Sequence, residues 1–356
     1  CLRSQEMPPM RNTSTQVLGF YSRQVALPGP EKTAMRERRN ANRSRLKLGL
    51  DANNKPKPYG QWSQGSYAMH TMIQDADNDY DIDDGAYFHK DDLVGPQGGE
   101  MSALDVRQMV CDALQDDRFA KAPEHLKNCV RVYYNEGFHV DVPSYRRFVD
   151  KDPWSGAEVE KFELASADWK VSDPREVTKW FKRQNRALSY DCKDTEGQFL
   201  RIVKLLKAFA RSRSSWKGQI ATGFMITKLA SEHFDGQADR DDLAFRITMK
   251  NIEARLKWQK DIEHPTLHGE EINHADDARP EFLRARLEEN LKHLDVLDEP
   301  NCSHADAMSA WDRLFSTDWF SGQPDPDDGE KATVGSAGGP TAPVQKRGGG
   351  RYGRFG

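Results

Sequence analysis

The most regular pattern of apolar positions in the chain has the period of an α-helix and lies at residues 197–211. Phe199, Ile202, Leu206 and Phe209 follow one another at steps of three or four residues, so they share one face of a helix. This spacing predicts a helix with a buried apolar face.

Similar spacing predicts further helices. The segment 172–176 has the composition of a helix start, with Asp173 as the N-cap, Pro174 as the first helical residue and Glu176 closing a capping box. The other predicted helices cover residues 31–48, 102–116, 221–234, 241–258, 280–295 and 304–315. We interpret most arginines of the helix at 31–48 as a solvated face; the alternative is a helix that lends charge to a phosphate site.

Alternation with a period of two predicts strands at residues 79–88, 130–134 and 138–142, the last two joined by a turn at 135–137. In the third strand Asp141 lies on the face opposite to the apolar side chains, because successive residues of a strand point to opposite sides. These strands predict a sheet in the first half of the chain.

Two aspartates separated by a single residue lie in the first of these strands. Asp81 and Asp83 therefore point to one side, while Tyr80 and Ile82 face the core. Carboxylates that converge in this way suit Mg²⁺, which prefers oxygen ligands. The Gly-Ser pair at 65–66 lets the backbone approach a phosphate and supplies hydrogen-bond donors to it.

Phosphoryl and nucleotidyl transfer need metal ions beside the phosphates and a cation for the leaving group. Asp141 on a neighbouring strand is the natural third carboxylate beside Asp81 and Asp83. In the helix at 197–211 we expect a lysine to face the triphosphate, Lys207 as the first choice and Lys204 as the second.

Composition narrows the class of protein. The net charge is −4, which gives no bulk electrostatic attraction for nucleic acid. No run is long and apolar enough to span a membrane, and no apolar signal-peptide core occurs near Cys1. The five cysteines are scattered, as is typical of reduced thiols. We therefore expect a cytoplasmic protein.

The chain divides into four predicted parts. The last 36 residues contain ten glycines and four prolines, which is typical of a disordered tail. The predicted parts are an irregular N-terminal segment at 1–30, a catalytic lobe at 31–190, a helical lobe at 191–320 and the tail at 321–356.

Four motifs in this order resemble the bacterial CD-NTase family, the cGAS/DncV-like cyclic-oligonucleotide synthases of anti-phage CBASS signalling. They are Gln-Gly-Ser-Tyr at 64–67, Tyr-Asp-Ile-Asp-Asp-Gly at 80–85, His-Val-Asp-Val-Pro-Ser-Tyr at 139–145 and Trp-Lys-Val-Ser-Asp-Pro at 169–174. The resemblance extends over residues 64–315. It implies an α+β fold, a polymerase-β-like nucleotidyltransferase with a mixed-sheet lobe, a helical lobe and the active site in the cleft between them.

The resemblance also implies roles for individual residues. Asp81, Asp83 and Asp141 would hold Mg²⁺, with Mn²⁺ as the alternative ion, and would be the catalytic residues. The residues implied to bind nucleotide are Gln64, Gly65, Ser66, Tyr67, Arg131, Lys204, Lys207 and Thr222. Among these, Thr222 stands where the family often has Ser, and Arg131 would read the acceptor base.

The glycine-rich tail adds an expected partner. Some members of this family end in a glycine or a similar small residue, which an E1–E2-like conjugating enzyme joins to a target. A tail ending in Gly356 resembles such a substrate. The competing interpretation is a flexible tail without this role.

We expect a cyclic dinucleotide synthase that uses ATP and GTP, with 3′,3′-cyclic GMP-AMP as the best candidate product and a downstream effector that responds to it. The alternatives are a linear oligonucleotide synthase or RNA nucleotidyltransferase, and a catalytically silent nucleotide sensor. The acidic net charge weighs against RNA as an obligate partner, and intact Asp81, Asp83 and Asp141 weigh against the silent sensor.

Overall fold

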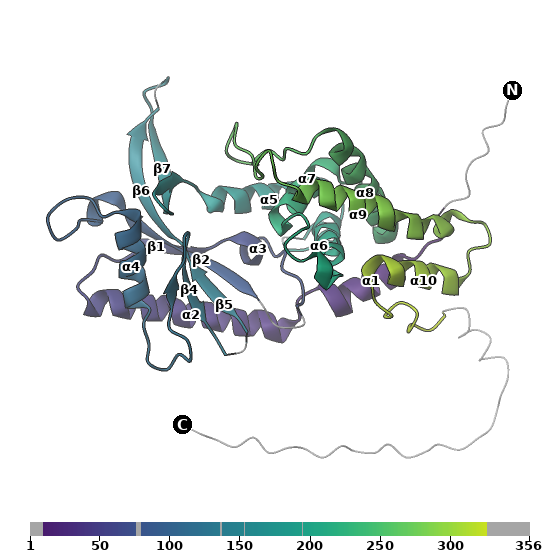
Figure 1. Cartoon of the computed structure of the whole chain (residues 1–356), viewed down its shortest axis with the longest axis horizontal. Coiled ribbons are helices and arrows are strands. Elements are labelled where there is room, and N and C mark those ends of the chain that lie inside the picture. The colour runs from purple at the N-terminus through teal and green to yellow at the C-terminus, as the bar shows by residue number, and fades with distance from the viewer. Residues whose placement is uncertain (1–9, 76–79, 136, 153, 194, 326–356) are drawn as a thin grey trace, which may run out of the picture.

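The computed structural model describes residues 10–75, 80–135, 137–152, 154–193 and 195–325. These residues form a sheet lobe and a helical lobe, side by side along the long axis of the molecule (Figure 1). Arg11 and Thr13 lie in the helical lobe, because the Arg11 N–H donates to the Leu297 carbonyl and Trp311 Nε1 donates to Thr13 Oγ1 at 3.0 Å. The N-terminal segment and the last helix therefore pack together.

The sheet of the described residues has eight strands and is mixed. Its order is β3-β4-β5-β2-β6-β7-β8, and β1 pairs with β2 outside this order. β2 runs parallel to β5 and β6, and the other pairs are antiparallel. The strands are β1 (Gly60–Ser63), β2 (Asp81–His89), β3 (Glu124–His125), β4 (Val130–Tyr133), β5 (His139–Val142), β6 (Ser144–Lys151), β7 (Glu158–Ala165) and β8 (Trp169–Val171).

Two helices, α2 (Gly29–Ala52) and α4 (Ala103–Ala113), pack on the sheet lobe and on each other. Gly49 lies where they cross, and a Cβ added there would be 1.9 Å from the Ala113 carbonyl oxygen. The glycine therefore permits close contact between the two backbones. Ser102 begins α4 with a complete capping box to Asp105.

The helical lobe has its own apolar core. Phe199, Ile202, Leu206 and Phe209, the stripe predicted from sequence, are all buried in it. The helices are α1 (Ser14–Phe20), α5 (Pro174–Leu188), α6 (Gln198–Arg211), α7 (Gly223–His233), α8 (Asp241–Trp258), α9 (Arg279–Leu291) and α10 (His304–Phe315). α6 contacts α5, α7, α8 and α10, so it forms the centre of this lobe.

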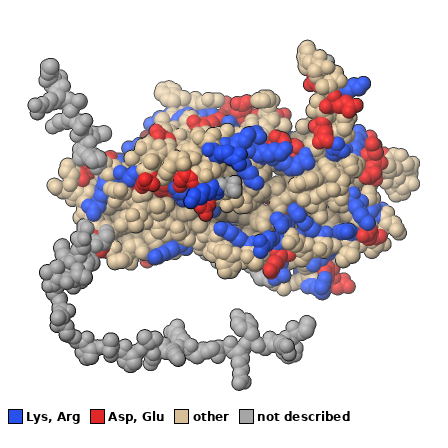
Figure 2. Space-filling model, turned by 180° about the vertical axis from the view of Figure 1, so that it is seen from behind, with Lys and Arg blue, Asp and Glu red and all other residues tan. Residues whose placement is uncertain are grey.

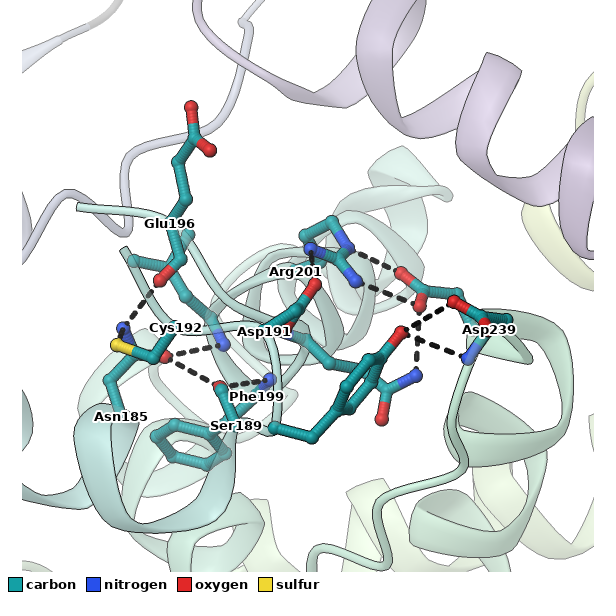
Figure 3. Close-up of polar contacts among 12 residues, drawn as sticks. Asn185, Ser189, Asp191, Cys192, Glu196, Phe199, Arg201 and Asp239 are labelled. Carbon is teal, nitrogen blue, oxygen red and sulfur yellow. Dashed lines mark hydrogen bonds and ion pairs between the residues drawn. The ribbon is translucent and has the colours of Figure 1, made fainter. Parts of the chain in front are cut away.

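Polar side chains hold the start of α6 in place (Figure 3). Arg201 forms hydrogen bonds with Asp191 and with the buried Asp241, and Ser189 Oγ accepts from the Phe199 N–H at 2.9 Å. Gly197, the N-cap, has a φ of +142°, and a Cβ there would be 2.6 Å from Ser189 Oγ. Only glycine fits this position without displacing the network.

The structure corrects several predictions. Residues 14–25, part of the segment predicted to be irregular, are helical. The long hairpin of β6 and β7, which projects from the sheet lobe, was not predicted. Asp173 caps α5 as expected, but Glu176 forms an ion pair with Lys179 instead of closing a capping box. Within the tail predicted at 321–356, residues 326–356 lie outside the described residues.

Candidate active site

Three aspartates lie side by side on two neighbouring strands of the sheet lobe. In the parallel pair of β2 and β5, Asp81 lies opposite His139 and Asp83 lies opposite Asp141. Tyr80 and Ile82 are buried on the other face, as the alternation predicts. The register therefore brings the predicted carboxylates together on one face.

The Gly-Ser turn packs directly against this row. Gly65 has a φ of +62°, and a Cβ added there would be 2.1 Å from Asp83 Oδ2. The Gln64 N–H donates to the Asp83 carbonyl at 2.9 Å, which ties the turn to β2. Gly65 thus lets the backbone approach the carboxylate, and Ser66 follows it in the short helix α3 (Gly65–Ala68).

Burial and neighbouring negative charges both raise the pKa of Asp83. Burial, and then the neighbouring Asp141 and Asp81, raise the pKa of its carboxyl to about 7, while Arg131 opposes that rise. Three carboxylates in this arrangement attract cations, and oxygen ligands of this kind suit a hard divalent metal.

A guanidinium lies among these carboxylates. Arg131 on β4 donates from Nε to Asp141 Oδ1 and from Nη2 to Asp141 Oδ2, both at 2.7 Å, and its Nη2 is 3.1 Å from Asp81 Oδ1. His139 Nδ1 is 3.5 Å from the same Asp81 oxygen. No three His, Cys, Asp or Glu side chains of the described residues converge closely enough to hold a metal ion as they stand.

The donor set nevertheless fits a divalent cation. Asp81, Asp83 and Asp141 share one face in register, and Gly65 leaves open the space beside Asp83 that a Cβ would fill. These acids already attract one cation, the guanidinium of Arg131. These three aspartates are the residues that would hold the metal.

A cavity of about 820 Å³ lies between the lobes and contains two of the carboxylates, Asp81 and Asp83. Its lining also includes Gly65, Ser66 and residues of the helical lobe. This volume is in the range of small-molecule sites. The cavity therefore joins the aspartate row to the predicted phosphate-binding residues.

Lys207 on α6 reaches this cavity from the helical lobe. Its Nζ donates to Thr71 Oγ1 at 2.8 Å and to the Thr71 carbonyl at 3.2 Å. Burial, together with the nearby Arg211 and Lys204 cations, lowers the pKa of the Lys207 ammonium to about 7. An anion bound in the cavity would favour the charged form of Lys207.

Thr222 lines the same cavity at the start of α7. It is the N-cap of that helix, and its Oγ1 accepts from the Met225 N–H at 3.3 Å. Its hydroxyl proton remains available as a donor to a bound phosphate.

The structure does not bring all the predicted nucleotide-binding residues to this cavity. Lys204 and Tyr67 line a second, larger cavity of about 1710 Å³. Lys204 and Lys207 are neighbours on the surface of α6, yet each lines a different cavity. Gln64 is buried and donates to Tyr145 Oη at 3.0 Å, and Arg131 is engaged by Asp141. Figure 2 shows basic side chains gathered across the face opposite to that of Figure 1.

Arginines of α2 contribute to this second cavity, and one of them, Arg36, is also exposed to solvent, as expected for a solvated face. Arg36, Arg39 and Arg43 line it. Arg43 Nε donates to Asp84 Oδ2 at 2.7 Å, and the Asp84 carboxylate is buried. Arg43 therefore helps to hold α2 to the sheet.

Other residues of the 820 Å³ cavity were not assigned to the site from sequence. They include Thr71, which anchors Lys207, and Phe224 and His264, whose rings meet edge to face at 5.6 Å. Arg211, Arg213 and Lys217 add cations to the lining. The run of basic residues after the helix at 197–211 is the sequence signal for these cations, whereas nothing local marks Thr71.

Part of the sheet lobe is similar to a known nucleotidyltransferase domain. The model of the cyclic GMP-AMP synthase DncV-like nucleotidyltransferase domain matches residues 60–145. A cyclic GMP-AMP synthase from Escherichia albertii is 27% identical over 241 residues, which are 64% of this chain and 48% of that protein. The chain thus aligns with about half the length of this curated relative.

Solved structures share the fold of both lobes. Vibrio cholerae DncV bound to 3′-deoxy ATP superposes with a TM-score of 0.65 at 15% identity, over 86% of this chain and 96% of that one. Escherichia coli MS115-1 CdnC with ATP gives 0.64 at 14% identity, over 86% and 98%. Bradyrhizobium diazoefficiens CdnG with GTP gives 0.65 at 15% identity, over 91% and 99%.

The fold is α+β, a polymerase-β-like nucleotidyltransferase with a mixed sheet and a helical lobe, as predicted. The predicted resemblance to the CD-NTase family is confirmed by the match to the DncV-like nucleotidyltransferase domain at residues 60–145 and by the similarity to a cyclic GMP-AMP synthase.

Proposed function

We propose that this protein is a cyclic-oligonucleotide synthase that joins ATP and GTP, with 3′,3′-cyclic GMP-AMP as the best candidate product, in anti-phage defence. The observation that carries the proposal is the shared cavity, which the Gly65 turn and Lys207 line together with Asp81 and Asp83. Asp141 lies beside Asp83 on the neighbouring strand. Relatives of the same fold are named for bound ATP and GTP or as cyclic GMP-AMP synthases, which supports purine nucleotides as substrates.

The reaction would proceed in two equivalent transfers. The 3′-oxygen of one nucleotide attacks the α-phosphorus of another, a P–O bond forms, and the bond to pyrophosphate breaks while the hydroxyl proton leaves. The linear intermediate then turns over, and its free 3′-hydroxyl repeats the attack to close the ring. Mg²⁺, or Mn²⁺ as the alternative ion, would supply charge neutralisation at the phosphates when bound by the three aspartates.

The residues of the chain itself provide position and charge. The hydroxyl groups of Ser66 and Thr222 would donate hydrogen bonds to the phosphates of the donor nucleotide, and the Lys207 ammonium would stabilise the negative charge that develops on pyrophosphate. Thr71 holds Lys207 by two hydrogen bonds, so the ammonium is oriented before nucleotide binds. Preorganised charge of this kind lowers the barrier without reorganisation.

Product analysis tests the proposal. The purified protein is incubated with all four NTPs and Mg²⁺, treated with phosphatase and examined by mass spectrometry. A phosphatase-resistant cyclic species containing adenine and guanine supports the synthase. A phosphatase-sensitive chain supports the linear alternative, and tight nucleotide binding without any product supports the silent sensor.

The proposed partner of the tail rests on sequence alone, because Gly356 lies outside the described residues. We propose that an E1–E2-like enzyme joins Gly356 to a target. Incubating the full chain with such an enzyme and ATP should give an adduct in intact-mass spectrometry that Gly356→Glu abolishes. An adduct that persists in this variant places the linkage elsewhere, and its absence in the wild type contradicts conjugation by that enzyme.

A further inference from the structure

Arg131 and Asp141 face each other across two antiparallel strands. β4 and β5 pair so that Arg131 lies directly opposite Asp141. Two parallel hydrogen bonds of 2.7 Å join the guanidinium to both carboxylate oxygens. This bidentate geometry is the strongest arrangement of such a pair, and the register holds it in place.

The same guanidinium also reaches the next carboxylate. Arg131 Nη2 is 3.1 Å from Asp81 Oδ1, so one cation spans two of the three acids to which the family assigns a metal. The side chain of Asp141 is only 10% exposed, and that of Asp81 is 52% exposed. A partly buried carboxylate beside two others needs a positive charge close by, and Arg131 provides it.

A divalent metal and Arg131 would therefore compete for the same oxygens. A metal bound to Asp81 and Asp141 would take over the lone pairs that Arg131 now uses, and the two cations would repel each other at this separation. The aspartates stand in register, and Arg131 already occupies oxygens of Asp141 and Asp81 that a metal ion would need.

We propose that Arg131 is an internal counter-cation of the catalytic carboxylates. In the metal-free protein it neutralises Asp141 and Asp81, and it must release Asp81 and loosen its hold on Asp141 when a divalent cation binds. Arg131 is thus a positioning residue that sets the metal concentration at which the site fills. The inference depends on the proposed function only in taking these aspartates as metal ligands.

Metal binding can be measured without turnover. Mn²⁺ is titrated into nucleotide-free protein and the free ion is followed by electron paramagnetic resonance. Arg131→Gln should bind Mn²⁺ about tenfold more tightly than the wild type, the order expected when a cation a few ångströms away is removed. Arg131→Lys, which keeps the charge, should bind Mn²⁺ more weakly than Arg131→Gln. Arg147→Gln removes an arginine paired with Glu160 on the hairpin and should leave binding unchanged.

A second readout separates this role from simple structural support. Without metal, Arg131→Gln should melt at a lower temperature than the wild type. Saturating Mg²⁺ should raise the melting temperature of Arg131→Gln by more than it raises that of the wild type. If Arg131 instead only orients Asp141 for metal binding, Arg131→Gln should bind Mn²⁺ more weakly than the wild type. Unchanged or weaker binding in this variant overturns the inference.

Failure of this inference can be told from failure of the proposed function. If Asp81→Asn with Asp83→Asn leaves Mn²⁺ binding intact, the aspartate row is not the metal site and the proposed function loses its basis. If that double variant abolishes binding while Arg131→Gln does not strengthen it, only the role of Arg131 is overturned.

Discussion

Gly65 is the residue at which the site tolerates the least change. A Cβ at this position would lie 2.1 Å from Asp83 Oδ2 on a backbone with a φ of +62°. We expect Gly65→Ala to displace Asp83 and to lower the rate of nucleotide transfer by about 100-fold, with the fold retained. Initial rates of product formation at saturating NTP and Mg²⁺ test this.

Gly156→Ala is the matched control for that substitution. Gly156 also has a positive φ, +68°, but a Cβ there would meet nothing within 4 Å. Both variants carry backbone strain, and only Gly65→Ala intrudes on a carboxylate. Equal rates for the two variants contradict the assigned contact.

Lys207 gives the site a dependence on pH. Its pKa is lowered to about 7 in the free protein, so at about pH 8 most molecules carry a neutral Lys207, and a bound triphosphate restores the charge. Nucleotide binding at about pH 8 should therefore take up a proton, and affinity should fall as pH rises above about 7.

Calorimetry of nucleotide binding without metal, in buffers of different ionisation enthalpy, measures this proton. Lys207→Met should remove both the uptake and the pH dependence. Lys179→Met, which changes an exposed lysine of the other cavity, should retain them. Identical proton uptake in wild type and Lys207→Met would show that the lysine does not titrate with binding.

At the residue scale, short motifs carry most of what sequence can predict. Asp81, Asp83 and Asp141 lie together as predicted, because a period of two and a parallel register determine which side each one faces. Lys204 lines a different cavity from Lys207, and a basic stripe on a helix does not show which neighbours surround each side chain. The contact between Thr71 and Lys207 joins distant parts of the chain, so no local pattern encodes it. The pair of Arg131 and Asp141 instead follows from the register of the hairpin of β4 and β5.

At the scale of elements, the crossing of α2 and α4 depends on one glycine. Gly49→Ala should destabilise the protein by about 1–3 kcal/mol, as overpacking does, because its Cβ would be 1.9 Å from the Ala113 carbonyl oxygen. Urea unfolding gives the value. Gly99→Ala, in an exposed loop where a Cβ meets nothing within 4 Å, should change stability by less than about 0.5 kcal/mol. A change of less than about 0.5 kcal/mol for Gly49→Ala as well would contradict close packing of α2 against α4.

Sequence patterns predict some helices closely and miss two strands. α8 and α10 have the predicted bounds, since the spacing of apolar residues marks both of them locally and a capping box begins α10. β6 and β7 were missed because their outer halves project from the lobe and expose Val149 and Val159, which leaves little alternation of apolar and polar residues.

At the scale of the whole molecule, composition and the order of elements predict two lobes, and the family resemblance places the active site between them. The cavity of about 820 Å³ lies there, with Gly65 and Asp81 from one lobe and Lys207 and Thr222 from the other. Sequence did not predict the second cavity of about 1710 Å³, because it forms only when α2, α5 and α6 come together. Within the part of the chain that the structure describes, every helix is too short or too polar to cross a membrane.

The central claim is that the aspartate row performs nucleotide transfer, and its most direct test is product formation by single aspartate variants. Wild type, Asp81→Asn, Asp83→Asn, Asp141→Asn and the exposed control Asp91→Asn are incubated with ATP, GTP and Mg²⁺, and the phosphatase-resistant product is quantified. We expect wild type and Asp91→Asn to make equal amounts, and each of the other three to lose product by at least about 100-fold while melting near the wild-type temperature. Undiminished product from Asp81→Asn or Asp83→Asn would contradict the account.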